Sequence, residues 1–215
     1  MTLESFENHP IQLVLELQDR LPAATFSFSQ YFYRPQSPID ERRVFDVRSG
    51  QITPDWLTSQ LQALPDDWEI ALNSLVKDSR ARMFHIPMID FSKRLVSGDD
   101  LILMRSILGV SICRTMVFYD SGRSLHAYCP QLIALKEWRE FMGRLLLLNL
   151  PNQEQLIDSR WVGHRLVSGY CALRWSSNSN HYLKMPTRTN IVLPTVGREL
   201  KSASGKQMHN DAFAT

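Results

Sequence analysis

Hydrophobic residues in the first 80 positions follow first a helical and then a strand-like pattern. Leu13, Leu15 and Leu17 form an imperfect apolar stripe, and the stretch ATFSFSQYFY alternates as a strand does. Beyond the polar stretch RPQSPIDERR, Thr53 stands before Pro54, a pair typical of a helix start. These patterns predict an N-terminal α/β layer over residues 1–80, packed on the rest of the chain. Its elements are helices over residues 10–21, 53–64 and 68–77 and a strand over residues 24–33.

From residue 83 onward the pattern becomes an alternation of strands and helices. The last strand is either LIDSRW at 156–161 or YCALRW at 170–175. With either one, the order is β-α-β-β-α-β, the split βαβ arrangement, which leaves one face of a four-stranded sheet open to ligands. We therefore expect an α+β fold, with this core over residues 81–190 and a polar tail, residues 191–215, that is mobile or docks a partner. The other predicted elements are strands over residues 83–91, 111–119 and 123–129 and helices over residues 97–108 and 132–148.

The stretch MVFYDSGRSLHAYCP, residues 116–130, predicts a hairpin with chemically active side chains. An apolar run ends at Asp120, a Ser-Gly turn follows, and the next strand alternates so that Ser124 and His126 point to one face. Arg123 stands beside them. The hairpin thus places a cation, a hydroxyl and an imidazole together.

Composition limits the classes of protein that the chain can represent. With 215 residues and 44% hydrophobic content, it is long enough for one compact domain with a sizeable core. The three cysteines are far apart and lack the spacing of a disulfide framework or a structural zinc site, which favours a reducing cytoplasm. No stretch of about 18 apolar residues predicts a membrane span. We therefore expect a cytoplasmic protein that has no membrane partner.

The net charge of +2 hides a strong asymmetry along the chain. Residues 1–158 carry 16 Lys and Arg against 20 Asp and Glu, whereas residues 159–215 carry 8 against 2. Basic residues interleaved with aromatic residues are typical of a surface that binds phosphates and stacks bases, although the same composition also fits a solvated face beside core aromatics. The candidate nucleic-acid-binding residues are Arg160, Arg165, Trp175, Lys184 and Arg188.

Three separated residues are candidates for catalysis. The predicted strands place Asp90 at a strand end, His126 on the hairpin and Asp158 after the second core helix, all on the open face of the sheet. Carboxylate oxygens suit Mg²⁺ or Mn²⁺ bound together with substrate phosphates. Asp90 and Asp158 are therefore the candidate metal ligands of a nucleotidyl-transfer site. The alternative for Asp90 alone is a strand-end residue that bonds loop amides.

The motifs IPMIDFS, GRSLHAY and LIDSRWVGHR followed by ALRW occur in the order of the archaeo-eukaryotic primase superfamily, the primase-polymerases. The chain resembles the catalytic core of that superfamily over about residues 80 to 188. The resemblance implies a two-metal polymerase-like site on an RRM-like sheet. It also implies metal binding by Asp90 and Asp158 and contacts to nucleotide phosphates by Arg123, Ser124, His126 and Arg174.

The chain departs from the pattern of that superfamily at Ser92, where a second acidic residue is normally found. A hydroxyl binds Mg²⁺ far more weakly than a carboxylate, so the departure leaves two functions open. One is a metal-dependent primase-polymerase that acts on nucleoside triphosphates and single-stranded DNA or RNA. The other is a catalytically reduced module that binds nucleotide or nucleic acid as a sensor or subunit. In either case a helicase, a nuclease or another subunit would supply targeting. An unrelated α+β domain in which the motifs coincide by chance is the third possibility.

Overall fold

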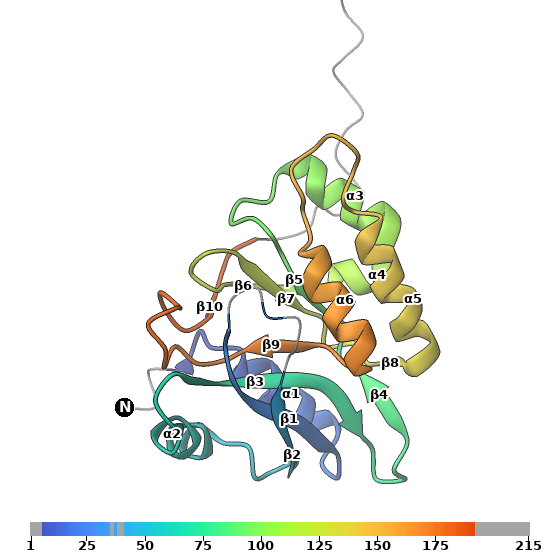
Figure 1. Ribbon diagram of the computed structural model, residues 1–215. Coiled ribbons are helices and arrows are strands. Elements are labelled where there is room, and N and C mark those ends of the chain that lie inside the picture. The colour runs from blue at the N-terminus through green and yellow to red at the C-terminus, as the bar shows by residue number, and fades with distance from the viewer. Residues whose placement is uncertain (1–5, 35–36, 38–40, 192–215) are drawn as a thin grey trace, which may run out of the picture.

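The computed structural model describes residues 6–34, 37 and 41–191, which form a mixed α+β fold with two antiparallel sheets (Figure 1). The larger sheet has the order β2-β1-β3-β4-β8, and β9 also pairs with β3. The smaller sheet has the order β10-β6-β7-β5. The larger sheet consists of β1 (Thr25–Phe32), β2 (Arg42–Arg48), β3 (Trp68–Lys77), β4 (Met83–His85), β8 (Ile133–Ala134) and β9 (Ala172–Arg174). The smaller sheet consists of β5 (Met88–Asp90), β6 (Val117–Asp120), β7 (Leu125–Tyr128) and β10 (Thr187–Arg188).

The expected strand over residues 83–91 is divided between the two sheets. β4 pairs with β3, and β5 pairs with β7. Pro87 lies between the two strands and has no N–H to donate, but its carbonyl accepts from Cys129 N at 2.9 Å. This change of sheet carries Asp90 away from the larger sheet and into the smaller one. Strands on both sides of residue 80 share the larger sheet.

The pairing in the smaller sheet confirms the expected split βαβ order. β7 lies between β5 and β6, and Phe91 forms an isolated antiparallel bridge with Ile157 on the other side of β5. The segment at residues 156–158 therefore takes the place of the fourth strand, reduced to a single bridge. The alternative segment at 170–175 instead contains β9 of the larger sheet.

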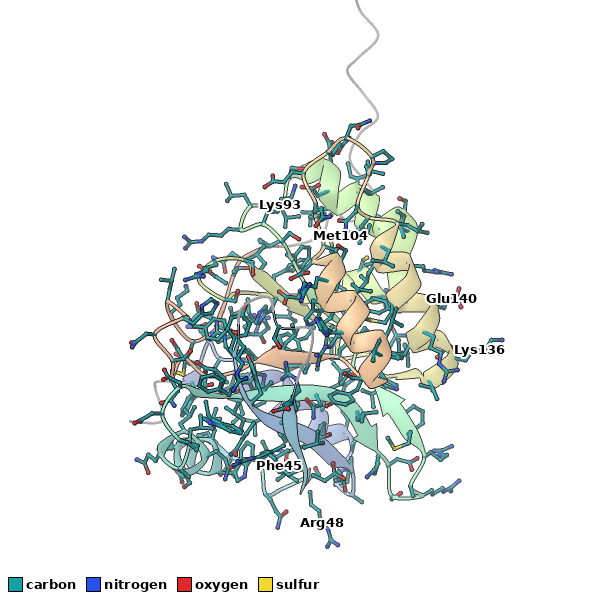
Figure 2. All side chains as sticks on the ribbon, viewed as in Figure 1. Phe45, Arg48, Lys93, Met104, Lys136 and Glu140 are labelled. Atoms are coloured by element: carbon teal, nitrogen blue, oxygen red, sulfur yellow. The ribbon has the colours of Figure 1, made fainter. Side chains whose placement is uncertain are left out.

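Helices α3, α4, α5 and α6 lie together on one side of the molecule (Figure 1). On α5, Trp138, Phe141, Met142 and Leu145 recur at helical spacing and are buried in the main core. Lys136 and Glu140 of α5 are exposed, as Figure 2 shows. None of the described helices combines the length and the apolar character needed to traverse a bilayer. The helices are α1 (Ile11–Arg20), α2 (Pro54–Gln62), α3 (Gly98–Leu108), α4 (Val110–Arg114), α5 (Leu135–Leu146) and α6 (Ser159–Ser168).

Two expected elements were wrong in type. The helix expected over residues 68–77 is β3, a central strand in which Ile70, Ala71 and Leu72 are all fully buried. Burial on both faces removes the alternation that identifies a strand. The strand expected over residues 111–119 begins only at Val117, because the helical layer continues past Gly109 through α4. In addition, β2 and α6 were not foreseen, and the expected tail from residue 192 onward lies outside the described residues.

Glu69 on β3 fastens the loop that follows β9. Its fully buried carboxylate accepts hydrogen bonds from Ser179 N at 2.8 Å and Ser179 Oγ at 2.7 Å, and also from Ser176 Oγ and Asn178 N. A buried carboxylate is tolerated where several donors satisfy it. This loop carries His181 and Tyr182, which line the cleft described below.

We expect Glu69→Ala to lower the free energy of unfolding by roughly 3 kcal/mol, because it leaves several loop donors without their acceptor. Urea denaturation followed by circular dichroism measures the change. The matched control is Asp46→Ala, which removes an exposed ion pair with Lys77 on the same sheet and should cost less than about 1 kcal/mol. Equal losses in the two variants would contradict a special role for Glu69.

Candidate active site

The structure brings Asp90, His126 and Asp158 together across neighbouring strands. Asp90 at the end of β5 is the register partner of His126 on β7, and His126 Nε2 lies 3.8 Å from Asp90 Oδ1. On the other side, Asp158 N donates to the carbonyl of Asp90 at 3.1 Å. Residues that are far apart in the sequence thus occupy adjacent positions around the end of one strand.

The surroundings of the Asp90 carboxyl disfavour its ionised form. Its side chain retains 22% exposure at the base of a cleft. Burial and then the neighbouring Asp158 raise its pKa to about 8, and the charge of Arg174 only partly opposes them. A cation placed between the two carboxylates would relieve this repulsion.

His126 is a neutral imidazole rather than a cation. It is 5% exposed, and burial followed by the charge of Arg174 lowers its pKa to about 3. Its buried Nδ1 has no hydrogen-bond partner among the described residues. Because a neutral imidazole carries a single N–H, the side chain can donate one hydrogen bond to a ligand but adds no positive charge at neutral pH.

Asp158 has a structural role in addition to its place beside Asp90. It is the N-cap of α6, and its Oδ1 accepts from Trp161 N at 2.9 Å. Because a capping carboxylate uses one oxygen for the helix, the other oxygen remains available to a ligand.

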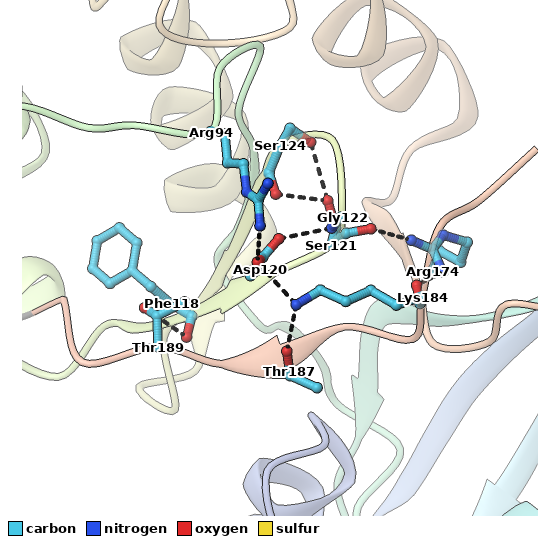
Figure 3. A network of polar contacts seen from close by, with 10 residues as sticks. All are labelled: Arg94, Phe118, Asp120, Ser121, Gly122, Ser124, Arg174, Lys184, Thr187 and Thr189. Atoms are coloured by element: carbon cyan, nitrogen blue, oxygen red, sulfur yellow. Dashed lines mark hydrogen bonds and ion pairs between the residues drawn. The ribbon is translucent and has the colours of Figure 1, made fainter.

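A network of polar contacts holds the hairpin turn between β6 and β7, as Figure 3 shows. Asp120 accepts from Gly122 N at 2.8 Å and from Arg94 and Lys184 at 2.9 Å each. Although burial opposes it, these hydrogen bonds lower the pKa of Asp120 to about 2. Gly122 has φ +104°, and a Cβ there would meet Leu183 Cβ at 3.1 Å, so the turn requires glycine.

This rigid turn presents Arg123 and Ser124 to the cleft. Arg123 is exposed and forms no hydrogen bond or ion pair with another described residue. Its guanidinium is therefore available to bind a phosphate. Ser124 Oγ lies 3.1 Å from Ser121 Oγ. An oxygen of a ligand could replace Ser121 as the hydrogen-bond partner of Ser124.

Arg174 is a buried cation whose terminal nitrogens are already engaged. Nη2 donates to Ser121 O at 2.7 Å, and Nη1 donates to Lys184 O at 3.0 Å and to Ser176 O. The guanidinium also lies 3.9 Å from the ring centroid of Tyr182. Arg174 thus connects the hairpin turn to the loop after β9 and contributes charge to the site, while both of its terminal nitrogens donate to backbone carbonyls and its buried Nε has no partner among the described residues.

No side chain in the described part of the chain replaces the acid missing at Ser92. Asp120 is committed to Arg94 and Lys184, and Asp100 binds Lys93 at 2.9 Å. Within the described residues no group of three or more His, Cys, Asp or Glu is arranged to hold a metal ion. The two carboxylates of Asp90 and Asp158 fit one divalent cation completed by substrate phosphates and water, but they do not provide for a second cation.

A cleft of about 580 Å³ runs over this site. Most of the predicted residues line it, but sequence reasoning missed the wall that the N-terminal strands contribute, because that layer had been interpreted as core. The predicted residues in the lining are Asp90, Arg123, Ser124, His126, Asp158, Arg160, Arg165 and Arg174, with Ser92 beside them; the residues that were missed include Tyr31, Tyr33, Arg34, Arg42, His164 and His181. Among the described residues the cleft lining thus contains six arginines against two aspartates, an excess of positive charge.

Three predicted nucleic-acid-binding residues lie elsewhere. The expectation for Trp175 was wrong, because its side chain is completely buried against Phe28 and His9. Lys184 is bound to Asp120, and Arg188 is on β10 at the edge of the smaller sheet, so neither lines the cleft. A basic composition could not distinguish these positions from the residues at the site.

Comparison with known proteins agrees with this geometry. The family model of the archaeo-eukaryotic primase 1D-like proteins (AEP-like) matches residues 48–187, a range that contains Asp90, His126 and Asp158. No curated protein matches the chain significantly. Because the match covers well over half of the sequence, the chain belongs to the archaeo-eukaryotic primase 1D-like family.

Proposed function

We propose that this protein is a primase-type nucleotidyltransferase that adds nucleotides from nucleoside triphosphates to single-stranded or primed nucleic acid with Mg²⁺ or Mn²⁺. The observation that carries the proposal is the adjacent pair Asp90 and Asp158 inside a cleft in which, among the described residues, the other charged side chains are all arginine. Arginine matches the geometry of phosphate oxygens, and paired carboxylates suit a divalent cation bound together with a nucleotide. Both the triphosphate and the strand are polyanions that fit this charge distribution.

Each group has a separate task in the proposed reaction. Arg123 binds the phosphates from the rigid turn, and neutral His126 donates one hydrogen bond without adding charge. A cation held by Asp90 and Asp158 would supply charge neutralisation and alignment of the α-phosphate with a 3′-hydroxyl. The arginines of the cleft counter the charge that develops on the departing pyrophosphate.

Ser92 favours a second candidate function, a reduced module that binds nucleotide or nucleic acid without joining them. With two carboxylates and no group of three metal ligands among the described residues, Asp90 and Asp158 would hold one phosphate-bound cation but would not support a two-metal displacement. Such a module would act as a sensor or as a subunit beside a helicase, a nuclease or another protein. The experiments below separate the two functions.

The first prediction concerns catalysis. We expect incorporation of labelled nucleotides on primed or single-stranded DNA with Mn²⁺, and a loss of at least about 100-fold in Asp90→Asn and in Asp158→Asn, because each change removes one of the two anionic ligands. Asparagine is as good an N-cap as aspartate, so Asp158→Asn tests the charge while preserving the start of α6. Absence of incorporation by the native protein, with nucleotide binding intact, would favour the binding module.

The second prediction concerns stability in the presence of a chelator. The folded-state pKa of Asp90 is raised to about 8 from an unfolded value of about 4, so its contribution to stability is full below pH 4 and is lost as the pH rises to about 8. We therefore expect metal-free Asp90→Asn to melt about 3 °C or more above the native protein at pH 8.5, and the difference to shrink towards pH 5. Calorimetry at both pH values measures this. A difference that does not depend on pH would contradict the raised pKa.

The third prediction concerns phosphate binding. We expect Arg123→Ala to weaken binding of nucleoside triphosphate about tenfold with little change in melting temperature, because the exposed side chain has no other described partner to lose. Isothermal titration calorimetry measures the affinity. The matched control is Arg139→Ala, an exposed arginine on α5 outside the cleft, which should bind as the native protein does. Equal effects of the two substitutions would indicate only a general charge effect.

A further inference from the structure

Tyr33, His181 and Tyr182 form an aromatic wall on one side of the cleft. The rings of Tyr33 and His181 are stacked, with centroids 4.3 Å apart and planes inclined by 29°. Tyr182 packs edge-on against His181 at 4.8 Å and tilted against Tyr33 at 5.5 Å. All three side chains line the cleft and are partly exposed, so the wall is not part of the closed core.

The wall is built from two segments that are far apart in the sequence. Tyr33 follows β1, whereas His181 and Tyr182 belong to the loop after β9, which Glu69 fastens. Tyr31 Oη and Tyr182 Oη lie 3.4 Å apart, and Arg174 packs on the face of Tyr182. The wall is therefore held in place by interactions that do not involve a ligand, as a preorganised stacking platform requires.

Two arginines connect this wall to the catalytic residues. Arg174 packs on Tyr182, and its charge also acts on His126 and Asp90. Arg123 lines the same cleft as the wall, and burial, followed by the charges of Arg123 and Arg174, lowers the pKa of His181. A ligand with an aromatic ring against Tyr33 and His181 could thus extend its phosphates towards Arg123 and the carboxylate pair.

We propose that the wall of Tyr33, His181 and Tyr182 is a nucleobase-binding subsite, in which a base extends the stack of Tyr33 and His181 while its phosphates reach Arg123. This inference rests on the proposed function. It adds a site for the base of the nucleotide, whereas the arginines would bind only its phosphates. Stacking on an aromatic platform accepts any base, because every base has a π face. The subsite therefore predicts affinity for the base with little preference among bases.

The test compares ligands with and without a base. In the same Mg²⁺ buffer, isothermal titration calorimetry measures binding of ATP and of inorganic tripolyphosphate to the native protein, Tyr33→Ala and His181→Ala. We expect each substitution to weaken ATP binding about tenfold and to leave tripolyphosphate binding within about twofold. Tyr33→Phe keeps the ring and should restore ATP binding. Tyr170→Ala, a partly buried tyrosine near Tyr31 that does not line the cleft, is the control for nonspecific loosening.

A second arm identifies the source of the base. A single-stranded oligonucleotide is compared with an abasic strand of the same length by fluorescence anisotropy. A loss in Tyr33→Ala for ATP assigns the wall to the mononucleotide, and a loss only for the base-containing strand assigns it to a base of the strand. Equal weakening of ATP and tripolyphosphate, or no weakening of any base-containing ligand, overturns the subsite while leaving the proposed function intact. Failure of the native protein to bind any of these ligands would overturn both.

Discussion

Repulsion between Asp90 and Asp158 is the interaction around which the rest of the site is arranged. The backbone holds the two residues together, since Asp158 N donates to the carbonyl of Asp90. Burial and, after it, this proximity raise the pKa of Asp90 to about 8, so without a bound cation the site disfavours the charge of its own carboxylate. Strain of this kind is common at functional sites and is retained only where the surrounding fold can bear its energetic cost. Here the buried Arg174 supplies an opposing charge, which offsets the effect only in part.

Arg174 connects the region of Asp90 and His126 with the loops that surround the cleft. It binds the backbone of the hairpin turn and the backbone of the loop after β9, and its position on Tyr182 extends that connection to the N-terminal strands. A single buried cation thus contacts both walls of the cleft, and its charge adds to the effect of burial in lowering the pKa of His126. The terminal nitrogens of Arg174 donate to backbone carbonyls, whereas Arg123 on the turn is exposed, and our proposal therefore assigns phosphate binding to Arg123. The two arginines have similar chemistry but separate tasks, which their degree of burial decides.

Local sequence chemistry was sufficient for the hairpin and the core order but not for the N-terminal wall. The Ser-Gly turn and the alternation after Arg123 predicted the hairpin and β7 correctly, although β6 begins later than expected, at Val117. Ser97 and Thr53 marked the two helix starts where the structure has them. In contrast, β3 is buried on both faces and carries no alternation, so its apolar run was taken for a helix. Arg42 and Tyr33 could not be assigned to the site, because only the pairing of β1 with β2 and β3 brings them to the cleft. The sequence likewise could not show that Trp175, a candidate for nucleic-acid binding, packs on Phe28 of β1 and is completely buried.

Ser92 is best understood through the charge that it removes. A third carboxylate beside Asp90 and Asp158 would add to the repulsion that, after burial, raises the pKa of Asp90 to about 8, and would make a bound cation more favourable. With serine in that position, a Mg²⁺ or Mn²⁺ ion held by the two carboxylates would take its other ligands from water and, in our proposal, from phosphate oxygens of a nucleotide. Cation and nucleotide would then bind interdependently, each contributing ligands or charge that the other needs. The arginines that line the cleft fit this proposal, because they could bind the phosphates while the carboxylate pair supplied only part of the coordination.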